Sequence, residues 1–136
     1  MSAAEFLITH TALDAIVAHA RADAPAECCG MLLGTAGSIA EAVRARNIAS
    51  TSTRFLIDPQ DHIEARRVAR RQGIDVIGFY HSHPHSPALP SPTDLAEATY
   101  PEAVHLIVSL AGAAPDPRLF RIEPERAIEL PLTLIG

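Results

Sequence analysis

The segment IDVIGFYHSHPHSPALPSPTD, residues 74–94, joins the most strand-like run of the chain to a group of metal-binding residue types. Residues 74–80 are rich in branched and aromatic side chains, which predicts a β-strand. Because side chains alternate along a strand, His81 and His83 should project from the same face at its end. Pro84 has no amide hydrogen to donate, so we expect it to end the strand pairing and leave both imidazoles at the rim of the sheet.

The end of this segment has the pattern of a helix start. Ser91 is a preferred N-cap residue, and Pro92 suits the first helical position. Asp94 then falls in the first turn, where the helix dipole alone favours a carboxylate. Two neutral imidazoles and one carboxylate also form a set of three ligands that leaves a fourth tetrahedral position for water, as a catalytic zinc site requires. We therefore predict that His81, His83 and Asp94 bind a metal ion.

Two longer helices are predicted from their ends and apolar stripes. One covers about residues 11–22, where Thr11 and an aspartate three residues later form a capping-box-like start. The other opens with Asp58 as N-cap and a proline in the first helical position, and Gly73 ends it. We expect the second helix to turn Ile63, Val68 and Ala69 inward.

Short apolar runs bounded by turn residues predict further strands. The run CCGMLLG, residues 28–34, is followed by the turn-like TAGS and a second extended piece through Val43, which predicts a hairpin. Helices and strands mix without a strict βαβ repeat, which favours an α+β layered sandwich with a mixed central sheet. Other predicted strands cover residues 5–8, 55–57, 104–110, 118–122 and 127–130.

Length and charge restrict the class of protein. The chain has 136 residues, 48% of them hydrophobic, which is enough for one core, so we expect a single domain over residues 1–136. A formal net charge of -5 argues against nucleic acid as a partner. The chain contains neither a secretion signal nor an apolar run of about 18 residues, so we expect a cytoplasmic protein with no membrane partner.

Other residues that could carry chemistry have simpler interpretations. Cys28 and Cys29 are adjacent, a spacing that strains a disulfide, so we expect thiols of which at least one packs as a small apolar side chain. His85 should be solvated in its proline-rich loop, and His105 should be a hydrogen-bonded residue of the sheet. A solvated helix face, or alternatively a docking patch for an acidic partner, would account for Arg66, Arg67, Arg70 and Arg71.

Peptide hydrolysis also needs a proton acceptor outside the metal shell. Glu27 stands directly ahead of the predicted strand at residues 28–34, where it could lie at the edge of a neighbouring strand. Spacing alone does not select it over Glu64, Glu97 or Glu102.

These motifs together resemble the JAMM metallopeptidases, also called the MPN+ domain. The family pattern is a glutamate ahead of a strand, then His-x-His-Pro, a short spacer and Ser-x-x-Asp. In this chain the pattern is Glu27 before CCGMLLG, HSHP at residues 81–84 and SPTD at residues 91–94. The motifs span residues 27–94, and by length and element order the resemblance covers essentially the whole chain.

The resemblance implies a cytidine-deaminase-like fold with one zinc ion per chain, bound by His81, His83 and Asp94. It implies that Glu27 is the general acid/base, acting on a zinc-activated water, and that Ser91 is a second catalytic group that helps to stabilise the oxyanion. A serine hydroxyl that caps a helix has less freedom to meet an oxyanion, although hydrogen bonding to the site remains open to it.

The compact length resembles the prokaryotic branch of the family, whose members are associated with ubiquitin-like sulfur-carrier proteins ending in Gly-Gly. The expected function is peptidase or isopeptidase cleavage of an amide bond at that C-terminal tail. The alternative is a non-catalytic, zinc-stabilised module that binds a ubiquitin-like partner. Glu27 discriminates between them, because a binder has no use for a carboxylate beside the metal-bound water. The motifs carry no signal for an oligomeric state.

Overall fold

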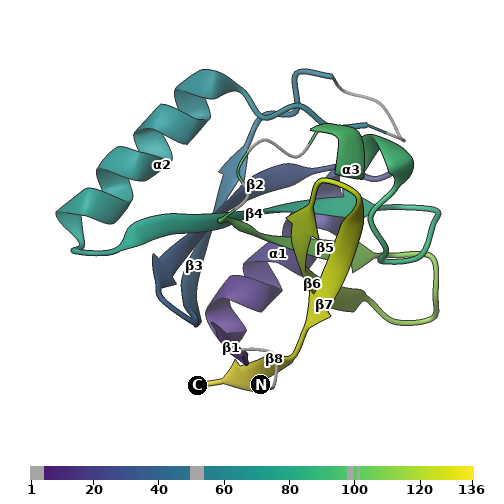
Figure 1. The fold of residues 1–136 in the computed structure, drawn as a ribbon. Coiled ribbons are helices and arrows are strands. Elements are labelled where there is room, and N and C mark those ends of the chain that lie inside the picture. The colour runs from purple at the N-terminus through teal and green to yellow at the C-terminus, as the bar shows by residue number, and fades with distance from the viewer. Residues whose placement is uncertain (1–4, 50–53, 98–99, 101) are drawn as a thin grey trace.

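A computed structural model of the chain describes residues 5–49, 54–97, 100 and 102–136 (Figure 1). Its helices are α1 (His10–Asp23), α2 (Pro59–Arg71) and α3 (Pro92–Glu97). Its strands are β1 (Phe6–Thr9), β2 (Cys29–Thr35), β3 (Ser38–Ala45), β4 (Asp75–His83), β5 (Val104–Ser109), β6 (Asp116–Glu123), β7 (Arg126–Leu130) and β8 (Leu132–Ile135).

The strands form one mixed sheet in the order β7-β6-β5-β4-β2-β3-β1-β8. The strand β4 runs through the middle, antiparallel to β2 and parallel to β5. The helix α1 covers one face of the sheet and α2 covers the other (Figure 1). The predicted α+β layered sandwich is therefore confirmed, with the layering that the JAMM resemblance implied.

Consecutive residues of β4 contribute to different cores, because side chains alternate across a strand. Tyr80 is buried in the core beneath α1, together with Ile16 and Ala20 of that helix. Its neighbour Phe79 is buried on the opposite face, in the core that α2 covers with Ala65 and Ala69. The sheet thus separates two hydrophobic cores, and β4 belongs to both.

The predicted hairpin and the second helix are confirmed. The strands β2 and β3 pair antiparallel around a turn in which Gly37 has a φ of 77°, a conformation that favours glycine. At the start of α2, the Asp58 side chain accepts a hydrogen bond from the Gln60 amide at 2.9 Å. The helix is followed by Gly73, which has a φ of 72°. Cys28 and Cys29 are both buried as free thiols, as expected.

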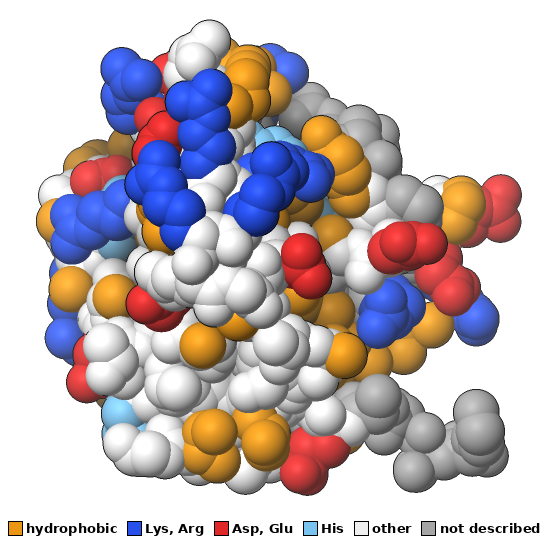
Figure 2. All heavy atoms as spheres, turned by 90° about the vertical axis from the view of Figure 1, so that its left-hand side faces the viewer, with side chains coloured by type: hydrophobic (Ala, Val, Ile, Leu, Met, Phe, Trp, Pro, Cys, Tyr) orange, Lys and Arg blue, Asp and Glu red, His pale blue; other side chains and the backbone are white. Residues whose placement is uncertain are grey.

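The arginines of α2 lie on the outside of the molecule. Figure 2, which faces this side, shows basic side chains gathered on its surface. All four side chains are exposed, as both a solvated face and a docking patch for an acidic partner require: Arg66, Arg67, Arg70 and Arg71. None of the helices among the described residues is long and apolar enough to cross a membrane.

The start of α1 differs from the prediction. The helix begins at His10, and its N-cap is Thr9, whose hydroxyl accepts a hydrogen bond from the Ala12 amide at 3.1 Å. Thr11, the expected cap, therefore lies inside the first turn. Both Thr9 and Thr11 are preferred N-cap residues. Thr9 is the cap because β1 ends there and the helix follows directly.

The strand predicted at residues 55–57 and the inward position predicted for Ile63 are both wrong, and the strand β8 was not predicted. Residues 55–57 form no strand: Ile57 makes only an isolated bridge with Asn47, and the Leu56 amide bonds to the Asn47 side chain at 2.9 Å. Ile63 is 47% exposed, because the inward face of α2 is centred on Ala65 and Ala69. The strand β8 pairs parallel with β1 at the edge of the sheet.

Gly78 allows β4 and β5 to approach closely. A Cβ atom at this position would lie 2.2 Å from the carbonyl oxygen of Val104, its partner in β5. A backbone atom cannot rotate away, so any larger residue here would push the two strands apart.

We expect Gly78→Ala to lower the free energy of unfolding by about 1–3 kcal/mol, through overpacking between β4 and β5. Urea denaturation followed by circular dichroism measures this change. Gly112→Ala is the matched control, because a Cβ atom there would lie an ordinary 3.8 Å from the Ala114 carbonyl oxygen. Equal stability of the two variants would contradict the close approach.

Candidate metal centre

His81 and His83 lie together at the end of β4. Both imidazoles are buried, and their Nε2 atoms are 3.2 Å apart. The parallel pairing of β4 with β5 continues to His83, opposite Ser109, and β4 ends before Pro84, as predicted. The two side chains share a face because they are two residues apart on a strand.

The loop after β4 fixes the orientation of His83. Its Nδ1 lies 2.8 Å from the carbonyl oxygen of Pro87. A carbonyl oxygen only accepts, so Nδ1 carries the hydrogen and donates it, which leaves the Nε2 lone pair facing the site. Histidine ligands of metals are usually oriented in this way by a partner on their other nitrogen.

Asp94 completes the group from the first turn of α3. Its Oδ2 atom lies 3.1 Å from Nε2 of His81 and 3.1 Å from Nε2 of His83, and its side chain is only 6% exposed. The structure therefore brings together the three predicted ligands. The atoms that meet are Nε2 of His81, Nε2 of His83 and Oδ2 of Asp94.

Ser91 and Asp94 form a reciprocal capping box. The Ser91 hydroxyl accepts a hydrogen bond from the Asp94 amide at 3.0 Å, and Asp94 Oδ2 accepts one from the Ser91 amide at 2.8 Å. The predicted N-cap is confirmed. The same contacts hold the Asp94 carboxylate in position, so the capping of α3 and the geometry of the site depend on each other.

The electrostatics of this group suit metal binding. Burial alone would raise the pKa of Asp94, but the adjacent histidines and the hydrogen bond from the Ser91 amide lower it by more, so this pKa lies well below its ordinary value. Burial also lowers the pKa of His81, which favours the neutral imidazole that binds metals. The group therefore offers one anionic oxygen and an imidazole nitrogen with a free lone pair.

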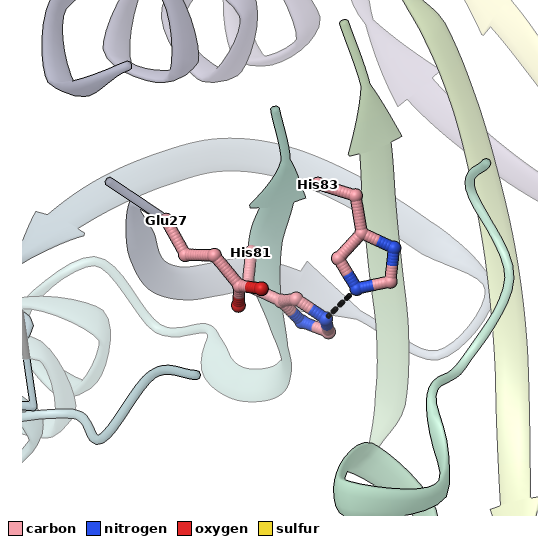
Figure 3. Close-up of side chains that lie close together, drawn as sticks. All are labelled: Glu27, His81 and His83. Carbon is pink, nitrogen blue, oxygen red and sulfur yellow. Dashed lines mark hydrogen bonds between the residues drawn. The ribbon is translucent and has the colours of Figure 1, made fainter. Parts of the chain in front are cut away.

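Glu27 approaches the histidines from the neighbouring strand. Cys29 pairs with His81 in the antiparallel register of β2 and β4, so continuing this register places Glu27 opposite His83 and on the same face. Candidate ligand atoms of Glu27, His81 and His83 lie within 4.8 Å of one another, and Figure 3 shows the carboxylate beside the imidazole rings. The described residues thus include a cluster able to hold a metal ion.

Hydrogen bonds on both sides hold the backbone at Glu27. The Cys28 amide donates to the Ser82 hydroxyl at 2.8 Å, and the Ser82 amide donates to the Cys28 carbonyl at 3.1 Å. The Asn47 side chain donates to the Glu27 carbonyl at 2.9 Å. The role of Asn47 was not predicted, because this role depends on a contact between residues that are twenty positions apart in the sequence.

The Glu27 carboxylate has an unusual environment. The residue is 3% exposed, and its Oε1 has no hydrogen-bond partner among the described residues. Burial, opposed by His83 and assisted by Asp94, raises the pKa of Glu27 to about 7. Buried polar atoms nearly always have a partner, so this oxygen is suited to a group bound at the centre.

The structure separates Glu27 from the other candidate glutamates. Glu64 is exposed on α2 beside Arg67, and Glu102 is exposed before β5. The Glu97 side chain lies outside the described residues. Glu27 is therefore the candidate that the described structure places at the histidines.

Two aromatic residues near the centre were not assigned correctly. Phe55 stacks on His81, with ring centroids 4.2 Å apart and an interplanar angle of 21°. His105 lies in a strand as expected, but its buried Nε2 has no partner among the described residues, so the expected hydrogen bond is wrong. The pKa of His105 is lowered to about 4, mainly by burial, so this imidazole is neutral. His85 is exposed, as expected.

We expect Ser91→Ala to lower the affinity for Zn²⁺ by about 10- to 100-fold, because Asp94 loses the hydrogen bond that positions it. The α3 N-cap should weaken by about 1 kcal/mol. Calorimetric titration of metal-free protein measures the affinity, and Ser91→Thr, which keeps the hydroxyl, should stay close to the wild type. An unchanged affinity in Ser91→Ala would contradict the positioning role.

Comparison with known proteins agrees with this geometry. Residues 9–123 match the family described as prokaryotic homologs of the JAB domain. The chain is 35% identical over 119 residues to a desampylase from Haloferax volcanii, which covers 82% of this chain and 86% of the relative. It is 34% identical over 99 residues to the CysO-cysteine peptidase of Mycobacterium tuberculosis, covering 71% of this chain and 68% of that one.

Among solved structures, a protein from Desulfitobacterium hafniense superposes with a TM-score of 0.88 at 29% sequence identity, covering 96% of this chain and 93% of its own. The family match extends over most of the chain and includes the glutamate, the histidines and the aspartate at the centre. This chain therefore belongs to the prokaryotic JAB-domain family, the prokaryotic branch of the JAMM/MPN+ group that its motifs resemble.

Proposed function

We propose that this protein is a zinc-dependent peptidase of the JAMM type. Its substrate would be the amide bond at the C-terminal Gly-Gly tail of a ubiquitin-like or sulfur-carrier protein. The observation that carries the proposal is the buried Glu27 carboxylate, with an unpartnered oxygen, beside the cluster of His81, His83 and Asp94. The relatives named desampylase and CysO-cysteine peptidase support the substrate class.

The donor set fits zinc. His81 and His83 would each contribute Nε2, and Asp94 would contribute Oδ2, with one ion per chain. Two imidazoles and one carboxylate are typical of catalytic zinc, and neither thiol is part of the cluster. When bound, zinc would lower the pKa of a water molecule and polarise the scissile carbonyl.

Glu27 would act as the general acid/base. It accepts a proton from the attacking water, whose hydroxide adds to the carbonyl carbon, and it donates that proton to the amine nitrogen as the C–N bond breaks. A pKa of about 7 places the carboxyl close to the balance between accepting and donating at neutral pH. A purely structural zinc module would have no use for such a carboxylate.

Ser91 would serve the site in two ways. Its oxygen accepts the Asp94 amide hydrogen, which positions a metal ligand. Accepting that bond leaves the hydroxyl hydrogen available to donate, so Ser91 would also stabilise the oxyanion that forms at the scissile carbonyl.

Substituting the histidine ligands should abolish metal binding. We expect His81→Ala and His83→Ala to lose the bound zinc, because two of three ligands cannot retain it against a chelator. Elemental analysis after dialysis with a weak chelator measures the zinc content per chain. His85→Ala, in the exposed loop, is the matched control and should keep one equivalent. Full zinc content in either ligand variant would refute the assignment.

Glu27→Gln should separate metal binding from chemistry. We expect it to keep one zinc per chain and to lose about 10²- to 10⁴-fold in kcat, because the amide cannot exchange the proton. Hydrolysis of a carrier fused through Gly-Gly to a test residue, followed by mass spectrometry, measures the rate. Wild-type turnover at matched zinc content would rule out the acid/base role.

A further inference from the structure

A cavity opens directly beside the proposed metal centre. Its volume is about 540 Å³, and its wall includes the ligands His81 and Asp94. Cavities of this size hold small molecules or large side chains. The cavity is therefore continuous with the site at which the scissile bond would lie.

The floor of the cavity is the same face of the sheet that presents the histidines. Phe79 lies two residues before His81 on β4, about 7 Å away along the strand. In the parallel register of β4 and β5, Phe79 pairs with His105, and both line the cavity. A substrate side chain that packs on Phe79 and His105 would therefore lie next to the metal ligands on the same face of the sheet.

Aromatic and aliphatic side chains form most of the remaining wall. Phe79 and Tyr100 have ring centroids 5.4 Å apart, and His62 meets Phe79 edge-on at 5.3 Å. Ile122 closes the side formed by β6, and Phe55 lies flat against His81 at the end nearest the metal centre. Such rings favour a flat aromatic group between them.

The Gly-Gly tail cannot fill this space, because glycine has no side chain. Of the two groups joined by the scissile amide, only the one that follows the tail can bring a side chain beside the metal centre. The cavity therefore suits the first residue of the group that is released, rather than the carrier itself.

One residue of the wall has a polar atom without a partner. His105 is 8% exposed and lines the cavity, and its Nε2 forms no hydrogen bond with the described residues. A hydroxyl both donates and accepts, so it can pair with this nitrogen in either tautomer of the imidazole. A ring that carries a hydroxyl at its far end would supply the missing partner.

We propose that this cavity is the subsite for the first residue released after the Gly-Gly tail, and that it selects an aromatic side chain, with His105 favouring a ring that carries a hydroxyl. The proposal rests on the peptidase function proposed above. It assigns His105 as a specificity-determining residue for that reaction.

The test uses labelled peptides that contain Gly-Gly-Xaa-amide and differ only at Xaa. For the zinc-loaded wild type, we expect kcat/KM to be at least about tenfold higher with tyrosine than with alanine, and higher with tyrosine than with phenylalanine. His105→Leu should lose the preference for tyrosine over phenylalanine and keep the preference for both over alanine. His85→Leu is the matched control and should behave like the wild type.

A binding measurement separates this proposal from the peptidase function. Tyrosinamide, a mimic of the released group, is titrated into zinc-loaded Glu27→Gln while the imidazole nitrogens are followed by NMR. We expect a saturable shift at His105 with tyrosinamide and none with glycinamide. Cleavage that does not depend on Xaa, together with no shift, would overturn the subsite and leave the peptidase function standing. A shift without any cleavage after Gly-Gly would overturn the peptidase function instead.

Discussion

The register of β4 between β2 and β5 is the constraint on which the site depends. Antiparallel pairing with β2 places Glu27 opposite His83, and the alternation of side chains brings His81 to the same face. A slip of one residue between these strands would turn Glu27 to the other face of the sheet. Gly78 contributes to the same constraint, because β5 approaches its backbone too closely for a side chain.

Two carboxyl groups within this small volume have opposite properties, and their surroundings explain the difference. Asp94 accepts a hydrogen bond from the Ser91 amide and lies 3.1 Å from Nε2 of both imidazoles, so its pKa is lowered and it stays ionised. Glu27 is buried with one oxygen unpartnered, so its pKa rises to about 7. An anionic metal ligand and a proton-transfer group are the two roles that the proposed chemistry requires, and the fold produces them from the same functional group.

Local patterns predicted the features that local chemistry determines. The alternation at His81 and His83 and the capping of α3 by Ser91 follow from neighbouring residues, and both are observed. Features that depend on contacts between residues far apart in the sequence could not be predicted from local patterns. The Asn47 side chain bonds to backbone groups of Arg54 and Leu56 in place of the strand predicted there, and it also donates to the Glu27 carbonyl. The choice of Glu27 among the glutamates needed the family resemblance.

The central claim is that two imidazoles and one carboxylate hold a zinc ion that keeps an open position. X-ray absorption at the zinc edge, on protein loaded with one equivalent of zinc, tests this most directly. The account predicts a four-coordinate ion with two imidazole nitrogens, the remaining ligands being oxygen, and no sulfur. Sulfur from Cys28 or Cys29 among the ligands, or a shell closed by four protein side chains, would contradict it.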